Sequence, residues 1–432
     1  MKKLILLSFL LISISSFSQV DKLITDENVS RVIKTLSSDA MMGRPAVDPQ
    51  KMEPSIAFIE SEFKKIGLKP LKGLKNYRQE FQKEKVRLEN AVVTIDGETV
   101  SPDNTLILSD KENINASGLP VKTIAYDSTV TNKAQYFFGK AVSFARDTTS
   151  GLMLIAPEFE ASFRELKGYF SGRFTNKRTS IKVFVLGKTS ASSFTVKATQ
   201  KLEVIKMTNV TGMLEGNTKP EEMVVFSGHY DHLGILQPLN GDSIANGADD
   251  DASGTTAVIE LARYFKKTNK NNRTLIFVAF TAEEIGGYGS KYFSEQLVPE
   301  KVVAMFNIEM IGKASKWGQN SAFVTGYERS DFGAILEKNL AGTAFSFKAD
   351  PYPDQNLFYR SDNATLARLG VPAHTISTDQ IDIDKFYHTV DDEFETMDIK
   401  NIVATIRAIA LSAKSIVDGS DTPKRIDKAT VN

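Results

Sequence analysis

The sequence predicts an α/β fold with a mostly parallel central sheet, helices on both faces of that sheet, and an inserted β-rich accessory domain. From about residue 202 onward, short strands alternate with helical segments, and these strands are apolar throughout. Such strands are typical of a parallel sheet that is covered on both faces. Between residues 76 and 200 the pattern changes to short alternating runs separated by turn residues, which predicts a separate β-rich domain.

Length and composition agree with a multidomain globular protein. The chain has 432 residues, of which 41% are hydrophobic and 25% are charged. At roughly 150 residues per domain, this length predicts two or three domains. Lys and Arg together number 53, as do Asp and Glu, so no basic excess indicates a nucleic-acid partner. The absence of cysteine excludes disulfides, thiolate metal sites and a cysteine nucleophile.

The N-terminus has the features of a secretory signal over residues 1–18. Lys2 and Lys3 precede an apolar run, Leu4–Ile14, and small residues follow it. This run is shorter than the ~20 apolar residues that span a bilayer. We therefore expect a mature chain that begins near Gln19 and has no membrane span. It would be exported to the periplasm or the medium.

The next two segments are a helical lead-in and the accessory domain. Residues 20–75 predict a helical lead-in that packs on the α/β domain, with a helix from Asp26, a loop over Ala40–Pro49 and a second helix near Pro54–Ile66. Residues 76–200 predict the accessory domain, with a hairpin at Asp96-Gly97 and a helix near Phe159–Phe170 between two strands. No group of residues in this accessory domain indicates chemistry.

Residues 201–420 predict the α/β domain, and residues 421–432 a C-terminal tail. The expected strands are residues 223–227, 275–280, 302–308 and 373–377. The expected helices are residues 253–268, 287–297, 331–340, 365–369 and 399–417.

Polar residues follow several of these strands or lie in nearby loops, and in an open α/β sheet ligands bind at the carboxyl ends of the strands. A single histidine or an acidic triplet is usually structural, but several such groups at one edge are not readily explained that way. The segments are SGHYDHLG with His229, Asp231 and His232, NGADDDASG with Asp249, Asp250 and Asp251, FTAEEIGGYGS with Glu283 and Glu284, FNIEMIG with Glu309, and FYHTVDD with His388.

Histidines and carboxylates without thiolates suit a pair of zinc ions or related divalent ions. A bridging carboxylate can hold two such ions ~3.5–4 Å apart with a water between them, and a nearby free carboxylate can move the proton of that water. Glu283 and Glu284 offer one base and one ligand. Glu309 lies between Ile308 and Met310, where a charge needs either a metal or a salt bridge to Lys or Arg.

In this order, the segments GHYDHLG, GADDDASG, AFTAEEIGGYGS, NIEMIG and YHTVDD resemble peptidase family M28. This family of co-catalytic zinc exopeptidases includes bacterial leucine-type aminopeptidases and glutamate carboxypeptidase II. The resemblance covers about Val204 to Gly419, and SSDAMMGRP with KKIGLKP also resembles the family's lead-in. The region between them matches only loosely, where family members often carry an inserted domain.

The resemblance implies a role for each site residue. His229 and Glu309 would bind one zinc ion, Glu284 and His388 the other, and Asp250 would bridge both. The family usually has Asp in place of Glu309, which leaves the geometry of that metal open. The other implied roles are Glu283 as general base and acid, Asp231 as the residue that orients His229, and Tyr359, Ser361 and Asp362 as substrate contacts; Asp251 and His232 receive no ligand role, and His374 is expected to be structural.

The resulting expectation is an exported zinc-dependent exopeptidase, an aminopeptidase that acts on peptides or proteins. Two alternatives share the fold: a glutaminyl-cyclase-like acyltransferase with a single zinc ion, and a receptor-like member without catalysis. The complete set of five ligands and the retained base argue against both. Side-chain preference, the choice among amino-, carboxy- and dipeptidase, and oligomeric state are left open by the sequence.

Overall fold

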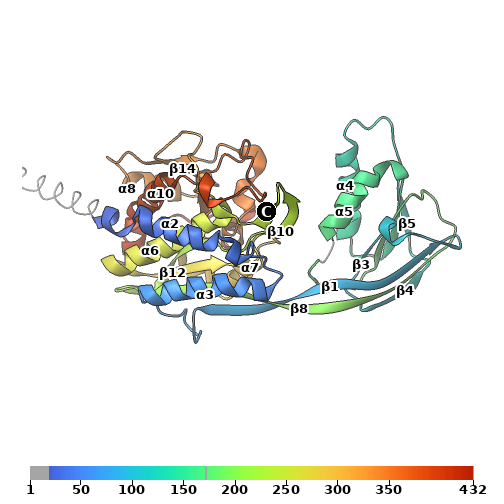
Figure 1. Cartoon of the computed structure of the whole chain (residues 1–432), viewed down its shortest axis with the longest axis horizontal. Helices are drawn as coiled ribbons and strands as arrows, with labels where there is room; N and C mark the ends of the chain where they lie inside the picture. The colour runs from blue at the N-terminus through green and yellow to red at the C-terminus, as the bar shows by residue number, and fades with distance from the viewer. Residues whose placement is uncertain (1–18, 171–172, 432) are drawn as a thin grey trace, which may run out of the picture. The chain divides into compact units, whose positions relative to one another are not determined.

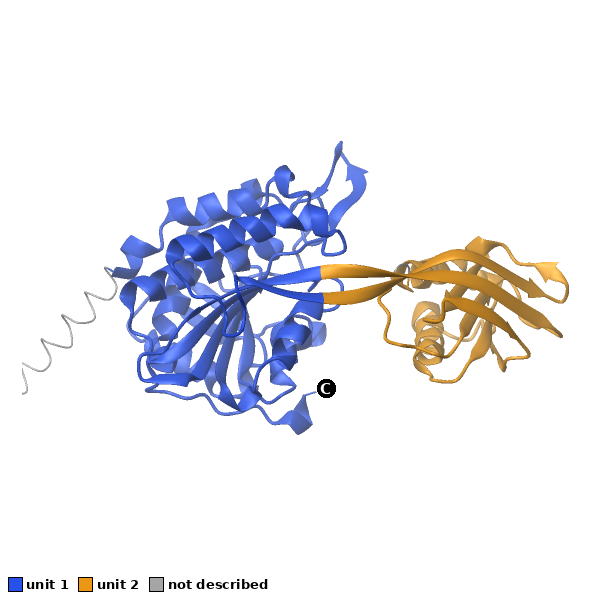
Figure 2. Ribbon diagram, turned by 90° about the horizontal axis from the view of Figure 1, so that it is seen from below, with its two compact units in different colours: residues 1–81, 207–432 blue, residues 82–206 orange. Residues whose placement is uncertain are grey.

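The computed structural model describes residues 19–170 and 173–431, so the predicted signal at residues 1–18 lies outside the described residues. The chain forms two compact units, residues 1–81 with 207–432 and residues 82–206 (Figure 2). The boundaries lie inside strands β1 (Arg78–Ile95) and β8 (Phe194–Leu214), about six residues beyond each limit that the sequence pattern suggested. The pattern marks a change of composition, whereas these strands continue through it.

Unit 1 contains a large mixed sheet whose centre is parallel. Strand β9 pairs in parallel with β12 and β13, and β13 pairs in parallel with β16. Antiparallel pairs, β12 with β8 and β14 with β16, lie toward the two sides. The strand order is β15 (Ser346–Ala349), β14 (Ser321–Val324), β16 (Ala373–Ser377), β13 (Val302–Ile308), β9 (Lys219–His229), β12 (Arg273–Phe280), β8 and β1. Strands β8 and β1 continue into unit 2, where β2 (Glu98–Thr99) pairs with β1 and β4 (Asn113–Ser117) pairs with β8.

Helices cover both faces of this sheet, which confirms the predicted α/β class (Figure 1). Along β9, Val224 and Phe226 face one buried cluster while Val225 faces the other. The first cluster includes residues of α2 (Asp26–Leu36), α3 (Pro49–Ile66), α6 (Gly254–Thr268), α8 (Phe332–Asn339), α10 (Ile399–Ser412) and α11 (Lys414–Asp418), and the second includes residues of α7 (Tyr288–Glu295) and α9 (Asn363–Ala367).

Local signals explain most of the helix boundaries. The side chain of Thr25 accepts a hydrogen bond at the start of α2, and Asp48 does the same for α3. Helix α3 begins five residues earlier than the sequence suggested because Asp48 caps it and Pro49 occupies its first turn. Pro54 removes one helical hydrogen bond without ending the helix.

Unit 2 has its own core and is mixed rather than purely β-structured. Parallel pairs join β5 (Val121–Ile124) to β6 (Gly151–Ile155) and β6 to β7 (Lys182–Leu186), while β3 (Thr105–Leu108) pairs antiparallel with β7. Helices α4 (Lys133–Arg146) and α5 (Glu160–Phe170) contribute to one buried cluster on this sheet, and β1, β4 and β8 contribute to another.

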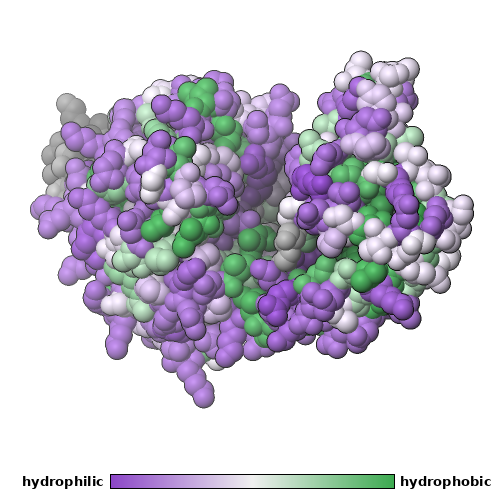
Figure 3. Space-filling view, turned by 45° about the vertical axis from the view of Figure 1, so that its right-hand side comes forward, coloured by the Kyte–Doolittle hydropathy of each residue, from purple (hydrophilic) through white to green (hydrophobic). Residues whose placement is uncertain are grey.

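The described part of the chain holds no helix with the length and apolar character needed to cross a membrane. In unit 1 a further hairpin, β10 (Gly234–Leu239) with β11 (Asp242–Ala245), connects the His229 segment to the acidic turn before α6. Figure 3 shows a mostly hydrophilic surface with scattered hydrophobic areas.

Candidate active site

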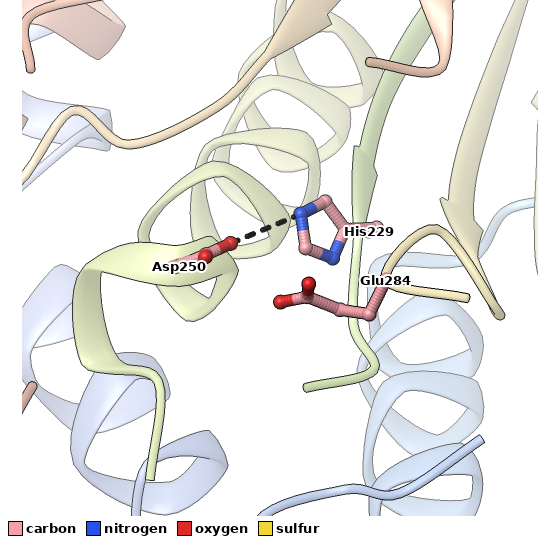
Figure 4. Close-up of side chains that lie close together, drawn as sticks. All are labelled: His229, Asp250 and Glu284. Carbon is pink, nitrogen blue, oxygen red and sulfur yellow. Dashed lines mark ion pairs between the residues drawn. The ribbon is translucent and has the colours of Figure 1, made fainter. Parts of the chain in front are cut away.

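The predicted site residues meet at the carboxyl ends of the central strands. His229 is the last residue of β9, Glu284 follows β12, and Glu309 directly follows β13. Asp250 lies in the turn Ala248–Ser253 that precedes α6, and His388 lies in the loop after β16. Figure 4 shows His229, Asp250 and Glu284 converging from three separate segments.

The two carboxylate oxygens of Asp250 face two different histidines. Its Oδ1 lies 3.2 Å from Nε2 of His229, and its Oδ2 lies 3.3 Å from Nε2 of His388. The same Nε2 of His388 lies 3.2 Å from Oε2 of Glu284. Asp250 therefore stands between two groups of donors, which is the position that a bridging ligand requires.

These residues fit a zinc centre. Oε2 of Glu309 is buried and has no hydrogen-bond partner among the described residues, so it lacks the partner that buried polar atoms normally have. Nε2 of His229 is also buried, and the ion-pair contact given for it is the one with Asp250 at 3.2 Å. His229, Asp250 and Glu284 present ligand atoms within 4.8 Å of one another. Imidazole nitrogens and carboxylate oxygens are both zinc ligands. His229, Glu309, Glu284, His388 and Asp250 would hold the metal.

Burial and mutual contacts shift the pKa values of the groups in this cluster in opposite directions. Burial by itself would raise the pKa of Asp250, but its contacts with His229 and His388 outweigh burial and hold the pKa well below its usual value. Burial opposes the charged form of His388, yet contacts with Asp250 and Glu284 raise its pKa to about 10. Burial raises the pKa of Glu283 well above its usual value and that of Glu309 to about 7. These carboxyl groups lack the positive charge that a bound divalent ion would supply.

Glu309 takes part in no ion pair with Lys or Arg among the described residues. Its Oε2 is unpartnered, and its backbone amide donates to the carbonyl of Ile376 at 3.1 Å. Glu309 lines the same pocket as Asp250 and His388. No Lys or Arg among the described residues therefore forms the salt bridge that was the alternative for Glu309. Its carboxylate can instead serve as a metal ligand in the pocket.

Two neighbouring aspartates support the cluster in different ways. The carbonyl of Asp231 lies 3.1 Å from Nδ1 of His229, whereas its carboxylate Oδ1 lies 3.7 Å away. That Oδ1 instead accepts a hydrogen bond from the amide of Glu283 at 3.1 Å. Asp231 thus orients His229 mainly through its backbone, a correction to the expected carboxylate contact. Asp251 accepts hydrogen bonds from the amides of His229, Gly254 and Met310.

His232 was expected beside the cluster without a ligand role, and its Nδ1 lies 2.7 Å from Oε1 of Glu284. The contact fixes one oxygen of Glu284 while the other faces His388. A hydrogen bond of this kind to a metal-ligating carboxylate holds it in place. One signal for this contact is the His-x-x-His spacing from His229 to His232, which does not show which histidine faces which carboxylate.

Arg44, within the SSDAMMGRP segment, fastens the segments that carry His229 and Asp250. Its fully buried guanidinium donates to the carbonyl of Tyr230 at 2.6 Å, of Asn246 at 2.6 Å and of Gly247 at 2.9 Å. Each of these carbonyls lies within four residues of His229 or Asp250. The lead-in therefore contributes directly to the site.

The pocket beside the cluster combines several carboxylates with a partly apolar wall. Ser361 lines it, as expected, and Arg360 and Tyr387 line it without having been predicted. Tyr359 does not line it; its hydroxyl donates to the carbonyl of Thr430 at 3.4 Å because the turn Leu357–Tyr359 directs it to another side. The lining residues include Asp250, Glu283, Glu284, Glu309 and His388 with Met310, Phe323, Leu357 and Ile381.

The remaining two predicted polar residues are buried. Asp362 is 1% exposed and does not line the pocket, and burial raises its pKa to about 6. Asp362 is therefore not placed to make the predicted contact with a substrate in this pocket. His374 has both ring nitrogens engaged, with Ser330 and with the carbonyl of Thr325, in agreement with a structural role.

The model of peptidase family M28 matches residues 209–413, the segment that supplies all five expected metal ligands. Residues 209–413 belong to peptidase family M28. The whole of unit 2, residues 82–206, lies outside the M28 match. Arg44 also lies outside it, although it contacts the site.

Curated relatives match over part of their length. A "Probable zinc metalloprotease" from Pyricularia oryzae is 32% identical over 153 residues, which is 35% of this chain and 28% of that protein. The "Aminopeptidase NAALADL1" from Mus musculus is 30% identical over 129 residues, which is 28% of this chain and 16% of that protein. The match thus spans less than a third of either relative.

Solved aminopeptidase structures share the fold. An aminopeptidase from Aneurinibacillus sp. strain AM-1 superimposes with a TM-score of 0.57 at 18% identity, covering 96% of this chain and 97% of that one. A zinc aminopeptidase from Bacillus subtilis gives a TM-score of 0.55 at 16% identity, covering 95% and 99%. At these identities the likeness establishes the fold.

Proposed function

We propose that this protein is an exported zinc-dependent aminopeptidase with two zinc ions. The observation that carries the proposal is Asp250, whose two oxygens face His229 and His388 separately. With Glu284 beside His388 and the unpartnered Glu309 in the same pocket, the chain offers donors for two ions that share one carboxylate.

When bound, the zinc ions would polarise the peptide carbonyl and lower the pKa of a water molecule to about 7. Glu283 lines the pocket, and its amide is held by Asp231, so its carboxylate is in place to receive the proton of the attacking water. The same carboxylate then delivers that proton to the amide nitrogen of the leaving group. This transfer is general acid–base catalysis, which contributes ~10²–10⁴-fold in rate.

The pocket supports a free amino terminus as the recognised group. Five carboxylates line it beside the apolar side chains of Met310, Phe323 and Leu357, namely Asp250, Glu283, Glu284, Glu309 and Asp379. Carboxylates that the metals do not fully neutralise would attract the α-ammonium group of a peptide, and the apolar wall would accept its first side chain. The solved structures of similar fold are aminopeptidases, which also supports the proposal.

Metal analysis combined with a peptide panel tests this function. The purified chain should hold two zinc ions and cleave a peptide with a free amino terminus. The same peptide with an acetylated amino terminus should resist, while amidation of its carboxyl terminus should have little effect. Cleavage only at free carboxyl termini would overturn the aminopeptidase assignment. One zinc ion with cyclisation of N-terminal glutamine would support the cyclase alternative, and two zinc ions without turnover of any peptide would support the receptor-like alternative.

Export is a separate part of the proposal, based on the signal expected over residues 1–18. Mass spectrometry of the protein recovered outside the cytoplasm should give an amino terminus near Gln19. Recovery of the intact chain from the cytoplasm would contradict it. Peptides that reach the periplasm or the medium would then be the available substrates.

A further inference from the structure

One ammonium group joins the three segments that carry Asp250, Glu309 and His388. Nζ of Lys313 lies 3.0 Å from Oδ2 of Asp249 and 2.7 Å from Oδ2 of Asp384. Asp249 directly precedes Asp250, Lys313 follows Glu309 by four residues, and Asp384 precedes His388 by four residues. No other contact described above touches all three segments.

Both carboxylates that Lys313 contacts are held on their other oxygen. Oδ1 of Asp249 accepts hydrogen bonds from the amide of Gly312 at 2.7 Å and the hydroxyl of Ser253 at 3.2 Å. Oδ1 of Asp384 accepts a hydrogen bond from the amide of Phe386 at 2.9 Å. Because each carboxylate is fixed to its own segment, the position of the ammonium sets the separation of the segments.

The segment that brings His388 to the site carries one end of this link, at Asp384. We call residues 381–388 the His388 arm. The chain just before the arm is fastened to β13's continuation, with Ser377 and Thr378 both donating to the carbonyl of Met310. Within the arm, Lys313 pairs with Asp384 and its Nζ lies 5.4 Å from the centre of the Phe386 ring. The side chain of His388 is 38% exposed, so burial alone does not fix it.

Lys313 also balances a concentration of negative charge. Asp249, Asp379 and Asp384 present carboxylate atoms within 4.8 Å of one another. Asp379 is 3% exposed and takes part in no ion pair with another described residue. Without the ammonium, three acidic groups would share one mostly buried place, and like charges at this distance repel. The repulsion would push the His388 arm away from the turn that carries Asp250.

We propose that Lys313 is a positioning residue that holds His388 at its metal-binding distance from Asp250. It lines no part of the pocket, so it acts through Asp249 and Asp384 and not on the substrate. The proposal rests on the proposed zinc function. Its specific consequence concerns one metal: the ion held by His388 and Glu284 depends on Lys313, whereas the ion held by His229 and Glu309 depends on it much less.

Zinc affinity measured by chelator competition on the full chain tests this role. Lys313→Met removes the ammonium and keeps most of the side-chain length. Residues that orient metal ligands typically change affinity 10–100-fold when mutated, so we expect the weaker-bound zinc of Lys313→Met to be lost at ~10–100-fold lower chelator strength. Lys313→Arg should recover most of the affinity. Lys316→Met, three residues away in an exposed position, is the matched control and should behave as the wild type.

Asp384→Asn tests the same link from the arm and changes no residue next to a ligand. If Lys313→Met does not fold, judged by circular dichroism, Asp384→Asn decides the question. Selective loss of one zinc ion in either folded variant, with recovery in Lys313→Arg, supports the proposal. Wild-type affinity for both ions in the folded variants, or equal weakening of both ions, overturns it. The proposed function is judged separately, because it fails if the wild type itself holds fewer than two zinc ions or cleaves no peptide.

Discussion

The aromatic core beneath the site gives a prediction whose size can be worked from the structure. Phe226 lies on β9, three residues before His229, and is fully buried. Its ring centre lies 4.9 Å from that of Phe306, 5.5 Å from that of Phe277 and 5.3 Å from that of Phe265. Phe226 therefore packs against both neighbouring strands and helix α6. Phe226→Ala removes the side chain that these three elements share.

The expected loss of unfolding free energy is about 4 kcal/mol. Truncation of a buried Phe to Ala costs ~3–5 kcal/mol, including the cavity that remains. Aromatic pairs add ~0.5–1.5 kcal/mol beyond their buried area, and Phe226 loses three. Strands β12 and β13, which both pair with β9, cannot move toward it to close the cavity, because the backbone hydrogen bonds fix the distance between paired strands. The loss should therefore not fall below the middle of the range, about 4 kcal/mol.

Urea unfolding followed by Trp317 fluorescence measures this loss. Trp317 is the single tryptophan of the chain and lies in unit 1, so its signal reports the unit that contains Phe226. With an m-value of about 3 kcal/mol/M in urea, a loss of about 4 kcal/mol lowers the midpoint by roughly 1.3 M. Val298→Ala, at a 53% exposed position, should shift it by less than a tenth of that amount. A midpoint within about 0.4 M of the wild type, with unchanged m, would refute the reasoning.

The remaining predictions concern the site and the lead-in. Glu283→Gln should keep both zinc ions and lower kcat by ~10²–10⁴-fold, because an amide cannot accept the proton; near-normal turnover would contradict this role. Glu284→Gln should instead reduce zinc content, measured by elemental analysis. Glu309→Ala should empty one zinc site, whereas two ions per folded chain would exclude Glu309 as a ligand. Contacts with Arg31 and Lys65 outweigh burial and lower the pKa of Glu62 below 4.5. On metal-free protein, the wild type should therefore have a higher free energy of unfolding than Glu62→Gln above about pH 4.5, and this difference should shrink as the pH falls. A difference that does not change with pH would contradict the prediction.

Much of the fold could be predicted because apolar periodicity acts locally. The expected strands 302–308 and 275–280 lie in fully buried strands, and their near-continuous apolar character indicated a sheet covered on both faces. The pattern did not show that strands at the sides of the sheet run antiparallel. Strand direction depends on how the chain returns between strands, and an apolar run has the same composition in either direction.

For the site, the sequence identified the residue types but not every contact. Carboxylates and histidines that follow strands indicated His229, Glu284 and Glu309 as neighbours, since parallel strands place their carboxyl ends at one edge. The contact between His232 and Glu284 was missed, because it depends on how the loop after β9 turns. Tyr359 was misplaced for a similar reason: the turn Leu357–Tyr359 directs its ring away from the pocket.

The sequence by itself determined the α/β class, the edge where polar residues gather and the chemical type of the centre, because strand burial and ligand chemistry depend on residue identity. Only the tertiary structure decided which atoms face each other. Asp250 stands between two histidines that are 159 residues apart in the chain, at 229 and 388. Lys313 meets Asp249 and Asp384 for the same reason: side chains from distant segments come together only after the sheet has fixed the positions of its loops.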